Sequence, residues 1–156
     1  MAIASSPRAA GPASLIERAV AILDRVPYAL IALLARFSVG MVFLNSGLTK
    51  VEGFAVTESA VYLFREEYRL PLLPPELAAH LAAAIELTMP WLLFAGLGAR
   101  FAALVLLAMT LVIEIFVYPS AYVTHGLWAT ALLLIVARGA GALSLDHLIA
   151  RQPRGT

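Results

Sequence analysis

The sequence predicts an all-α membrane protein, a four-transmembrane-helix bundle with short interfacial helices. Of its 156 residues, 62% are hydrophobic and 13% charged, and the mean hydropathy is +0.89. A soluble domain has about 45–50% apolar and about 25% charged residues. Four apolar runs, 27–48, 76–97, 99–118 and 121–138, are each long enough to cross a hydrocarbon layer of about 30 Å.

Composition also excludes several classes of function. The net charge is +1 and the basic residues are scattered, so we expect no nucleic-acid partner. The absence of cysteine excludes a disulfide, a thiol relay, an iron–sulfur cluster or a thiolate zinc site within this chain. No phosphate-binding glycine loop, nucleophile elbow or zinc-protease motif occurs.

The N-terminal region divides into a tail and a short helix. Residues 1–13, rich in Ala, Ser, Pro and Gly, are predicted to be a disordered tail, and 14–156 a single membrane domain. The tail lacks the apolar core of a cleavable signal peptide, so the first span is expected to act as the insertion signal. Ser14 is expected to cap a helix from Leu15 to Val26. That helix either lies on the membrane surface or extends the first span.

The first span, 27–48, has one face marked by small and charged residues. At about 100° per residue, this face carries Arg36, Gly40, Phe43, Gly47 and Lys50. Glycines permit close approach of another helix, so the face is predicted to point inward.

The segment 51–75 is the largest connection and mixes acids, bases and aromatics. Val61, Leu63, Phe64 and Tyr68 could bury in an interfacial helix that ends at the following prolines, Pro71, Pro74 and Pro75. A solvated connector is the alternative. The aromatics favour the interfacial helix, because such side chains suit the headgroup level.

The remaining spans are bounded by glycine and proline. The second span is predicted to pack through small residues and to kink at Pro90; those residues are Ala78, Ala79, Ala82, Ala83 and Ala84. Gly96 and Gly98 form the turn to the third span. After the fourth, Ser144 is expected to cap a last short helix, with Asp146 paired to Arg100 or Arg138.

Four spans place both termini on one side of the membrane. If that side is the cytoplasm, most arginines lie inside, whereas the outer segments carry only Lys50, Arg65 and Arg69. The positive-inside rule therefore predicts cytoplasmic termini in the cell inner membrane, with the segment 51–75 facing outward.

Two ions lie deep in the predicted spans. Arg36 follows the start of its span by about nine residues and Glu86 precedes the end of its span by about ten, so both are placed roughly 14–15 Å from the inner surface. A charge at that depth needs a partner. We therefore expect an Arg36–Glu86 ion pair, which would be either structural or functional.

A second polar group is predicted in the outer half of the membrane. Glu114 and His125 should reach similar heights, with His80 and Asn45 nearby. A desolvated Glu near two histidines could carry protons or hold a polar ligand. The alternative is hydrogen bonding that fixes helix packing. No metal-ligand spacing is present, so no metal is expected.

Four aromatic residues could stack on a quinone ring: Trp91, Trp128, Tyr118 and Tyr122. Such residues are also common as packing groups or interface anchors. We expect no cofactor in the chain itself beyond this potential for a quinone.

The chain resembles the DoxX family over residues 30–150. The resemblance is carried by Arg36 and the following FSVGMVFLNSGLTK, by Glu86, by GLGARFAAL and by GAGALSLDHLI. It implies a small four-helix membrane protein associated with quinol oxidation or thiosulfate–quinone oxidoreduction. It also marks as positions to test Arg36, Lys50, Glu86, Arg100, Ser144 and Asp146.

Three functions are compatible with the sequence. The first is a membrane subunit of a quinone- or sulfur-linked redox system, acting through a redox protein partner rather than catalysing alone. The second is a proton-coupled transporter or channel that uses Glu86 and Glu114. The third is a structural scaffold. The lipid bilayer is a partner in each of them, and the oligomeric state stays open.

Overall fold

The computed structural model describes residues 12–151, and four helical segments in that range are long and apolar enough to cross a membrane. They are α2 (Tyr28–Leu48), α4 (Pro75–Ala95), α5 (Ala99–Val112) with its π-helical continuation η2 (Ile113–Val117), and α6 (Tyr122–Arg138) after the 3₁₀ turn η3 (Pro119–Ala121). The predicted four-helix membrane bundle is confirmed.

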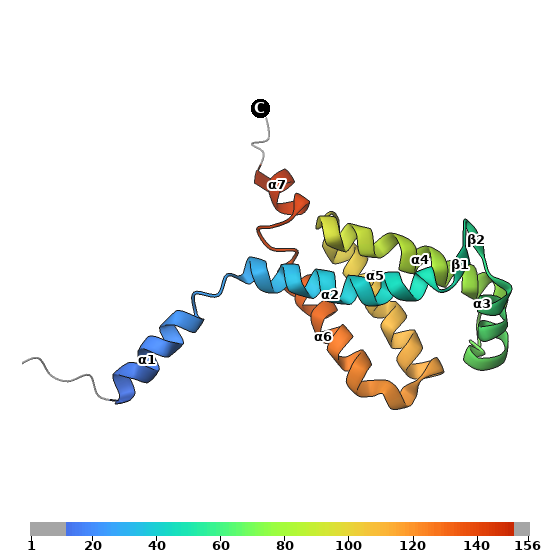
Figure 1. Cartoon of the computed structure of the whole chain (residues 1–156), viewed down its shortest axis with the longest axis horizontal. Coiled ribbons are helices and arrows are strands. Elements are labelled where there is room, and N and C mark those ends of the chain that lie inside the picture. Colours follow the sequence, from blue (N-terminus) through green and yellow to red (C-terminus); the bar gives the residue numbers. More distant parts are fainter. Residues whose placement is uncertain (1–11, 152–156) are drawn as a thin grey trace, which may run out of the picture.

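The shorter elements lie outside these spans. They are α1 (Pro12–Leu23), the antiparallel strands β1 (Val51–Glu52) and β2 (Ala55–Val56), α3 (Glu58–Leu63), the π-helical turn η1 (Phe64–Tyr68) and α7 (Leu145–Arg151). Residues 1–11 of the expected tail lie outside the described residues. Helix α1 begins at Pro12, so Ser14 lies within it rather than at its cap. This helix projects away from the bundle (Figure 1), and its surface location stays a prediction.

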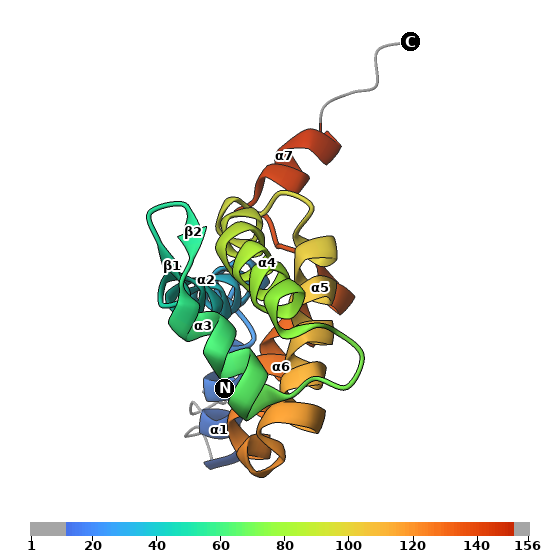
Figure 2. The same ribbon diagram turned by 90° about the vertical axis from the view of Figure 1, so that its right-hand side faces the viewer.

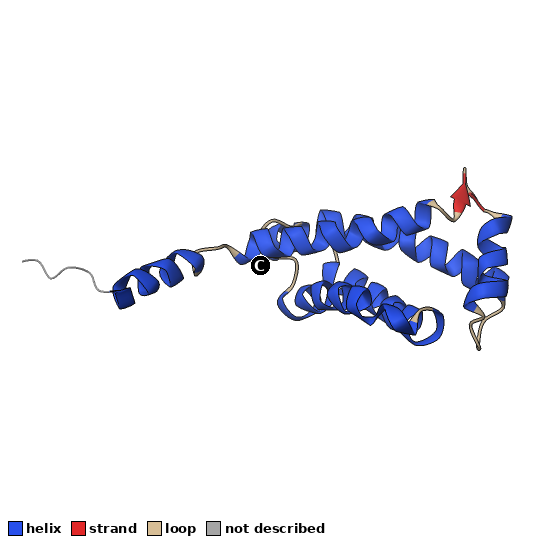
Figure 3. Ribbon diagram, turned by 60° about the horizontal axis from the view of Figure 1, so that its bottom comes forward, coloured by secondary structure: helices blue, strands red, loops and turns tan. Residues whose placement is uncertain are grey.

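The four spans form two helix pairs that diverge. Helix α2 packs on α4, and α5 packs on α6. The pairs meet where Gly96–Gly98 turns α4 into α5, which we call the glycine-turn end, and separate toward residues 49–74, the large-loop end (Figures 1 and 3). Figure 2 shows α3 lying across the large-loop end.

The predicted inward face of α2 is confirmed. Its five marked residues, Arg36, Gly40, Phe43, Gly47 and Lys50, are all buried. A Cβ built on Gly47 would lie 2.9 Å from the Glu86 Cβ, so α2 and α4 approach as closely as a glycine allows. Four of the five alanines of α4 are buried as expected, whereas Ala84 faces outward.

The C-terminal segment closes the glycine-turn end. The Asp146 carboxylate accepts hydrogen bonds from the backbone N–H groups of Gly98 and Ala99, at 2.8 and 3.1 Å. Asp146 therefore caps α5, and the predicted pairing with Arg100 or Arg138 is wrong, because unpaired N–H groups at a helix start attract the carboxylate. Ser144 caps α7 as predicted, accepting from the His147 N–H at 3.2 Å.

The predicted helix in the large loop exists, but it rests on the bundle. Phe64 is 6% exposed and belongs to an apolar cluster with Ala78, Ala79 and Ala82 of α4. The β1–β2 hairpin before it was not predicted; Gly53, with φ of +62°, lies in its turn. The segment thus covers the gap between the diverging helix pairs.

Candidate functional site

Arg36 and Glu86 do not form the predicted ion pair. The Arg36 guanidinium donates to the carbonyl oxygens of Leu93 at 3.1 Å and Leu143 at 2.5 Å. Its Nε has no hydrogen-bond partner among the described residues. Glu86 instead pairs with Lys50, at 2.7 Å between Oε2 and Nζ. The sequence identified both buried ions correctly but assigned them to each other wrongly.

The register of α2 against α4 explains this correction. Gly47 lies against Glu86, and a Cβ on Gly96 would clash with the Arg36 guanidinium. Glu86 precedes Gly96 by ten residues on α4, about 15 Å at about 1.5 Å per residue. Equal depths for Arg36 and Glu86 would require α2 and α4 to end in one plane. In fact α2 extends beyond α4 at the glycine-turn end, where Gly141 packs on Ala29.

Lys50, Ser46 and Glu86 form one hydrogen-bonded group between α2 and α4. The Lys50 Nζ donates to the Ser46 Oγ at 2.9 Å, to the Ser46 carbonyl at 3.2 Å and to Glu86. The Ser46 hydroxyl donates to the Glu86 Oε1 over 3.4 Å, the long end of the hydrogen-bond range. The ammonium group is therefore saturated, while Glu86 Oε1 keeps capacity to accept a further hydrogen bond.

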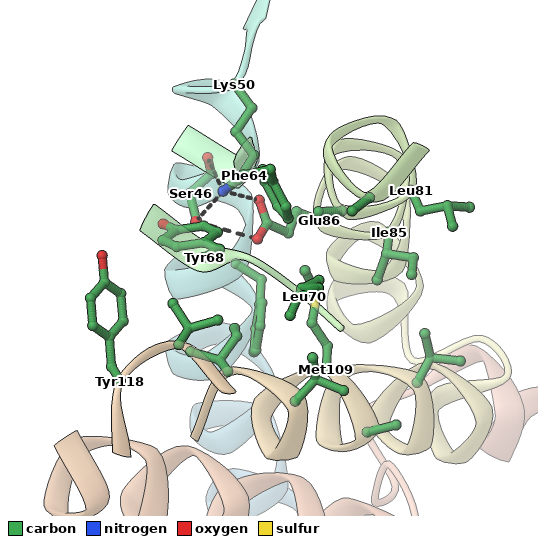
Figure 4. A pocket seen from close by; sticks show the side chains of 18 of the residues that line it. Ser46, Lys50, Phe64, Tyr68, Leu70, Leu81, Ile85, Glu86, Met109 and Tyr118 are labelled. Atoms are coloured by element: carbon green, nitrogen blue, oxygen red, sulfur yellow. Dashed lines mark hydrogen bonds and ion pairs between the residues drawn. The ribbon is translucent and has the colours of Figure 1, made fainter. Parts of the chain in front are cut away.

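This group borders a cavity of about 490 Å³ in the half of the bundle toward the large loop (Figure 4). The volume lies within the range of about 300–1,000 Å³ typical of small-molecule sites. Apolar side chains from α2, α4 and α5 make most of the wall, and Phe64 and Tyr68 cover it from η1. An apolar cavity with a few polar groups suits a lipophilic ligand with one polar end.

A second polar pair has one member, His125 of α6, at the same cavity. His125, 5% exposed, lines the cavity, and its Nδ1 lies 2.5 Å from the Glu114 Oε2. Glu114 belongs to the π-helical turn η2, a distortion often found at functional sites. The carboxylate fixes the imidazole so that Nδ1 carries a proton, which leaves Nε2 as the acceptor in the neutral ring. The predicted Glu114–His125 association is therefore present.

Several other predicted site residues lie elsewhere. Asn45 and His80 are exposed and do not line the cavity. The His80 Nδ1 lies 2.7 Å from the Glu76 carbonyl on its own helix. Arg100 and Asp146 are at the glycine-turn end, beside Gly139 and Gly98 respectively.

The aromatic candidates for ring stacking divide in the same way. Trp128 and Tyr118 line the cavity. Trp91 and Tyr122 are exposed and do not line it. Burial raises the pKa of the Tyr68 phenol above its ordinary value, and the neighbouring Tyr118 adds to this shift. The Tyr68 hydroxyl therefore stays neutral at the cavity wall and able to donate a hydrogen bond.

Comparison with known proteins agrees with this architecture. The family model described as DoxX matches residues 31–119, more than half of the chain. The chain belongs to the DoxX family. A protein of Haemophilus influenzae (strain Rd), described as an uncharacterized protein, is 31% identical over 131 residues, which cover 75% of this chain and 82% of the relative. No solved structure matches the chain significantly.

The DoxX match covers one wall of the cavity better than the other. It includes most of α2, all of α4 and α5, and hence Lys50, Glu86 and Glu114, and it ends before His125 and Asp146.

The sequence-based interpretation missed Ser46, Phe64 and Tyr68 as cavity residues. A signal existed for Ser46, because it lies one turn before Lys50, but the placement of η1 over the bundle had none.

Proposed function

We propose that this DoxX protein is a membrane subunit of a redox system and holds a quinone-class molecule in the cavity beside Lys50 and Glu86. The supporting observation is the cavity itself: about 490 Å³, with mostly apolar walls and a buried ion pair at one side. The chain has no cysteine for thiol redox chemistry, and in this proposal the electrons come from a partner protein. The subunit then supplies the lipophilic carrier and does not catalyse alone.

The polar groups at the cavity suit both redox states of such a ligand. A quinol hydroxyl can donate to the Glu86 Oε1, and a quinone carbonyl can accept from the Tyr68 phenol. Trp128 lines the cavity and can offer an aromatic face to the ligand ring. Its own ring is held in place by neighbouring rings, with centroid distances of 4.9 Å to His125 and 5.7 Å to Phe43. The apolar remainder of the wall accommodates the ring and part of a hydrocarbon tail.

We further propose that the protein lies in the cell inner membrane with both termini in the cytoplasm. The glycine-turn end, which carries Arg100 and Arg138, then faces inward, and α3 faces outward. In this orientation the cavity lies in the outer half of the bilayer. Protease accessibility of the two ends in sealed vesicles, or labelling of a single cysteine introduced at either end, tests the orientation.

The two tryptophans allow a direct test of quinone binding. Trp128 lines the cavity and Trp91 does not, and the chain has no others. In nanodiscs, a Trp91→Phe variant should show saturable fluorescence quenching when decyl-substituted para-benzoquinone is added. The matched Trp128→Phe variant should show only the linear quenching that follows partition into lipid. Equal, linear quenching of both variants would remove the proposal.

The partner is tested separately. Purification from native membranes in a mild detergent should recover an oxidoreductase whose quinone reduction depends on this subunit. Recovery of the chain free of any redox protein, with quinone-dependent activity of the membranes unchanged after its deletion, would leave the redox assignment unsupported.

A proton-coupled transporter is the second candidate, and the Glu114–His125 pair is the observation that favours it. A carboxylate and an imidazole at 2.5 Å can exchange a proton, and His125 borders the cavity. Proton flux in liposomes that a Glu114→Gln variant loses would select this function. Flux that persists in that variant, or that never appears, would count against it.

A further inference from the structure

The cavity has an apolar mouth between α4 and α5. Five of its lining residues are also exposed. One is Tyr118, beyond the end of η2, and the other four lie on α4, on α5 or directly before α4: Leu73, Leu81, Ala108 and Val112. All four are apolar and none carries a hydrogen-bonding side chain. At the level of the spans the surroundings are hydrocarbon, so this mouth opens toward acyl chains.

The polar wall of the cavity lies away from this mouth. Ser46 and Lys50 belong to α2, and the Glu86 carboxylate turns toward them, whereas Leu81 and Ile85 of the same helix extend in the other direction (Figure 4). Lys50 and Glu86 are 6% and 2% exposed, so this side is closed. The cavity is therefore polar at its closed side and apolar at its open side.

We infer that the ligand enters sideways from the bilayer between α4 and α5 and binds with its polar ring inward and its hydrocarbon tail in the mouth. This inference rests on the proposed quinone site and adds the route by which the ligand enters. It also specifies the class of ligand: a quinone with a long tail that stays in contact with lipid. The divergence of the two helix pairs makes the route, because α4 and α5 touch at the glycine turn and separate beyond it (Figures 1 and 3).

The small side chain of Ala108 keeps the mouth open. Ala108 lies on the exposed side of α5 and lines the cavity, so a larger side chain at this position would occupy the gap. Ala84 on α4 is a matched control, because it is also an exposed alanine of a spanning helix but does not line the cavity. Neither residue contributes to the polar wall.

The experiment uses the Trp91→Phe protein in nanodiscs, with Trp128 as reporter. Ala108→Phe should slow the binding of decyl-substituted para-benzoquinone about tenfold, while Ala84→Phe leaves the rate unchanged. The same quinone without its alkyl chain should be slowed much less by Ala108→Phe, because no tail has to occupy the mouth.

A reversible modification at the same positions separates blocking of the mouth from misfolding of a variant. The cysteine-free chain permits Ala108→Cys or Ala84→Cys to be modified with a benzyl methanethiosulfonate reagent and restored by a reductant. Blocking at 108, but not at 84, should slow the binding of a decyl-quinone whose ring is fully substituted, so that free thiols do not add to it. Reduction, followed by removal of the reductant before quinone is added, should restore the rate in the same sample. Equal effects at both positions, or equal slowing of the tailed and tailless quinones, would overturn lateral entry. Absence of saturable quenching in the unmodified protein would instead overturn the proposed function, and this inference with it.

Discussion

The two ends of the bundle bury charge in different ways. At the glycine-turn end, the Arg36 guanidinium donates to the carbonyl oxygens of Leu93 and Leu143, and Arg36 does not line the cavity. At the large-loop end, Lys50 and Glu86 neutralise each other beside a cavity. A buried ion enclosed by backbone oxygens indicates a structural role, whereas one that borders open volume can act on a ligand.

Replacement of Arg36 should have the largest effect and should concern stability alone. Arg36→Met removes both hydrogen bonds from the guanidinium to backbone carbonyls, which is expected to cost about 3–6 kcal/mol at about 1.5–3 kcal/mol per charged hydrogen bond. Thermal unfolding in detergent and folded yield measure this. Arg138→Met is the control, because that guanidinium is exposed and only lies over the Tyr28 ring at 5.2 Å. Equal stability of the two variants would contradict a structural role for Arg36.

The Lys50–Glu86 pair should separate stability from binding. Glu86→Gln leaves the Lys50 ammonium uncompensated and is expected to cost about 3 kcal/mol. Adding Lys50→Met removes the unpaired charge and should recover most of that stability. Saturable quenching of Trp128 by quinone should be lost in Glu86→Gln, and the double variant should not recover it. If the double variant binds quinone as well as wild type, the ion pair belongs with Arg36 as a purely structural feature.

Close approach of α2 and α4 is expected to matter less than either ion. Gly47→Ala would push a methyl group against the Glu86 Cβ, at 2.9 Å before relaxation, and should cost about 2 kcal/mol through strained packing. Gly126→Ala is the matched control, since nothing lies within 4 Å of its added Cβ. Unfolding temperatures of the two variants test this. A loss no larger for Gly47→Ala than for Gly126→Ala would mean that the helix contact is loose.

The cap at the glycine-turn end should give the smallest effect. Asp146→Ala removes the acceptor of the Gly98 and Ala99 N–H groups, and the loss should be about 1 kcal/mol. Quinone quenching of Trp128 should not change, because Asp146 is remote from the cavity. A change in binding with unaltered stability would show that the two ends are coupled.

Periodicity and helix-boundary signals were informative because they act locally. The glycine-bearing face of α2, the Gly96–Gly98 turn and the Ser144 cap were all predicted from spacing and residue type, and the structure confirms them. The Glu114–His125 association followed from similar heights on adjacent helices. In contrast, Arg36 was assigned the wrong partner, because helix length alone does not specify how far one helix slides along another.

The amino-acid sequence by itself determined that four apolar segments cross the membrane and that a few ions must be buried among them, because hydrocarbon does not solvate charges or free backbone groups. Only the tertiary structure decided which ions meet. The offset of α2 against α4 gives Lys50 to Glu86 and leaves Arg36 to carbonyl oxygens. It also decided that the helix pairs diverge and that η1 covers the gap. A cavity is a property of how helices are placed, which residue spacing within each helix does not encode.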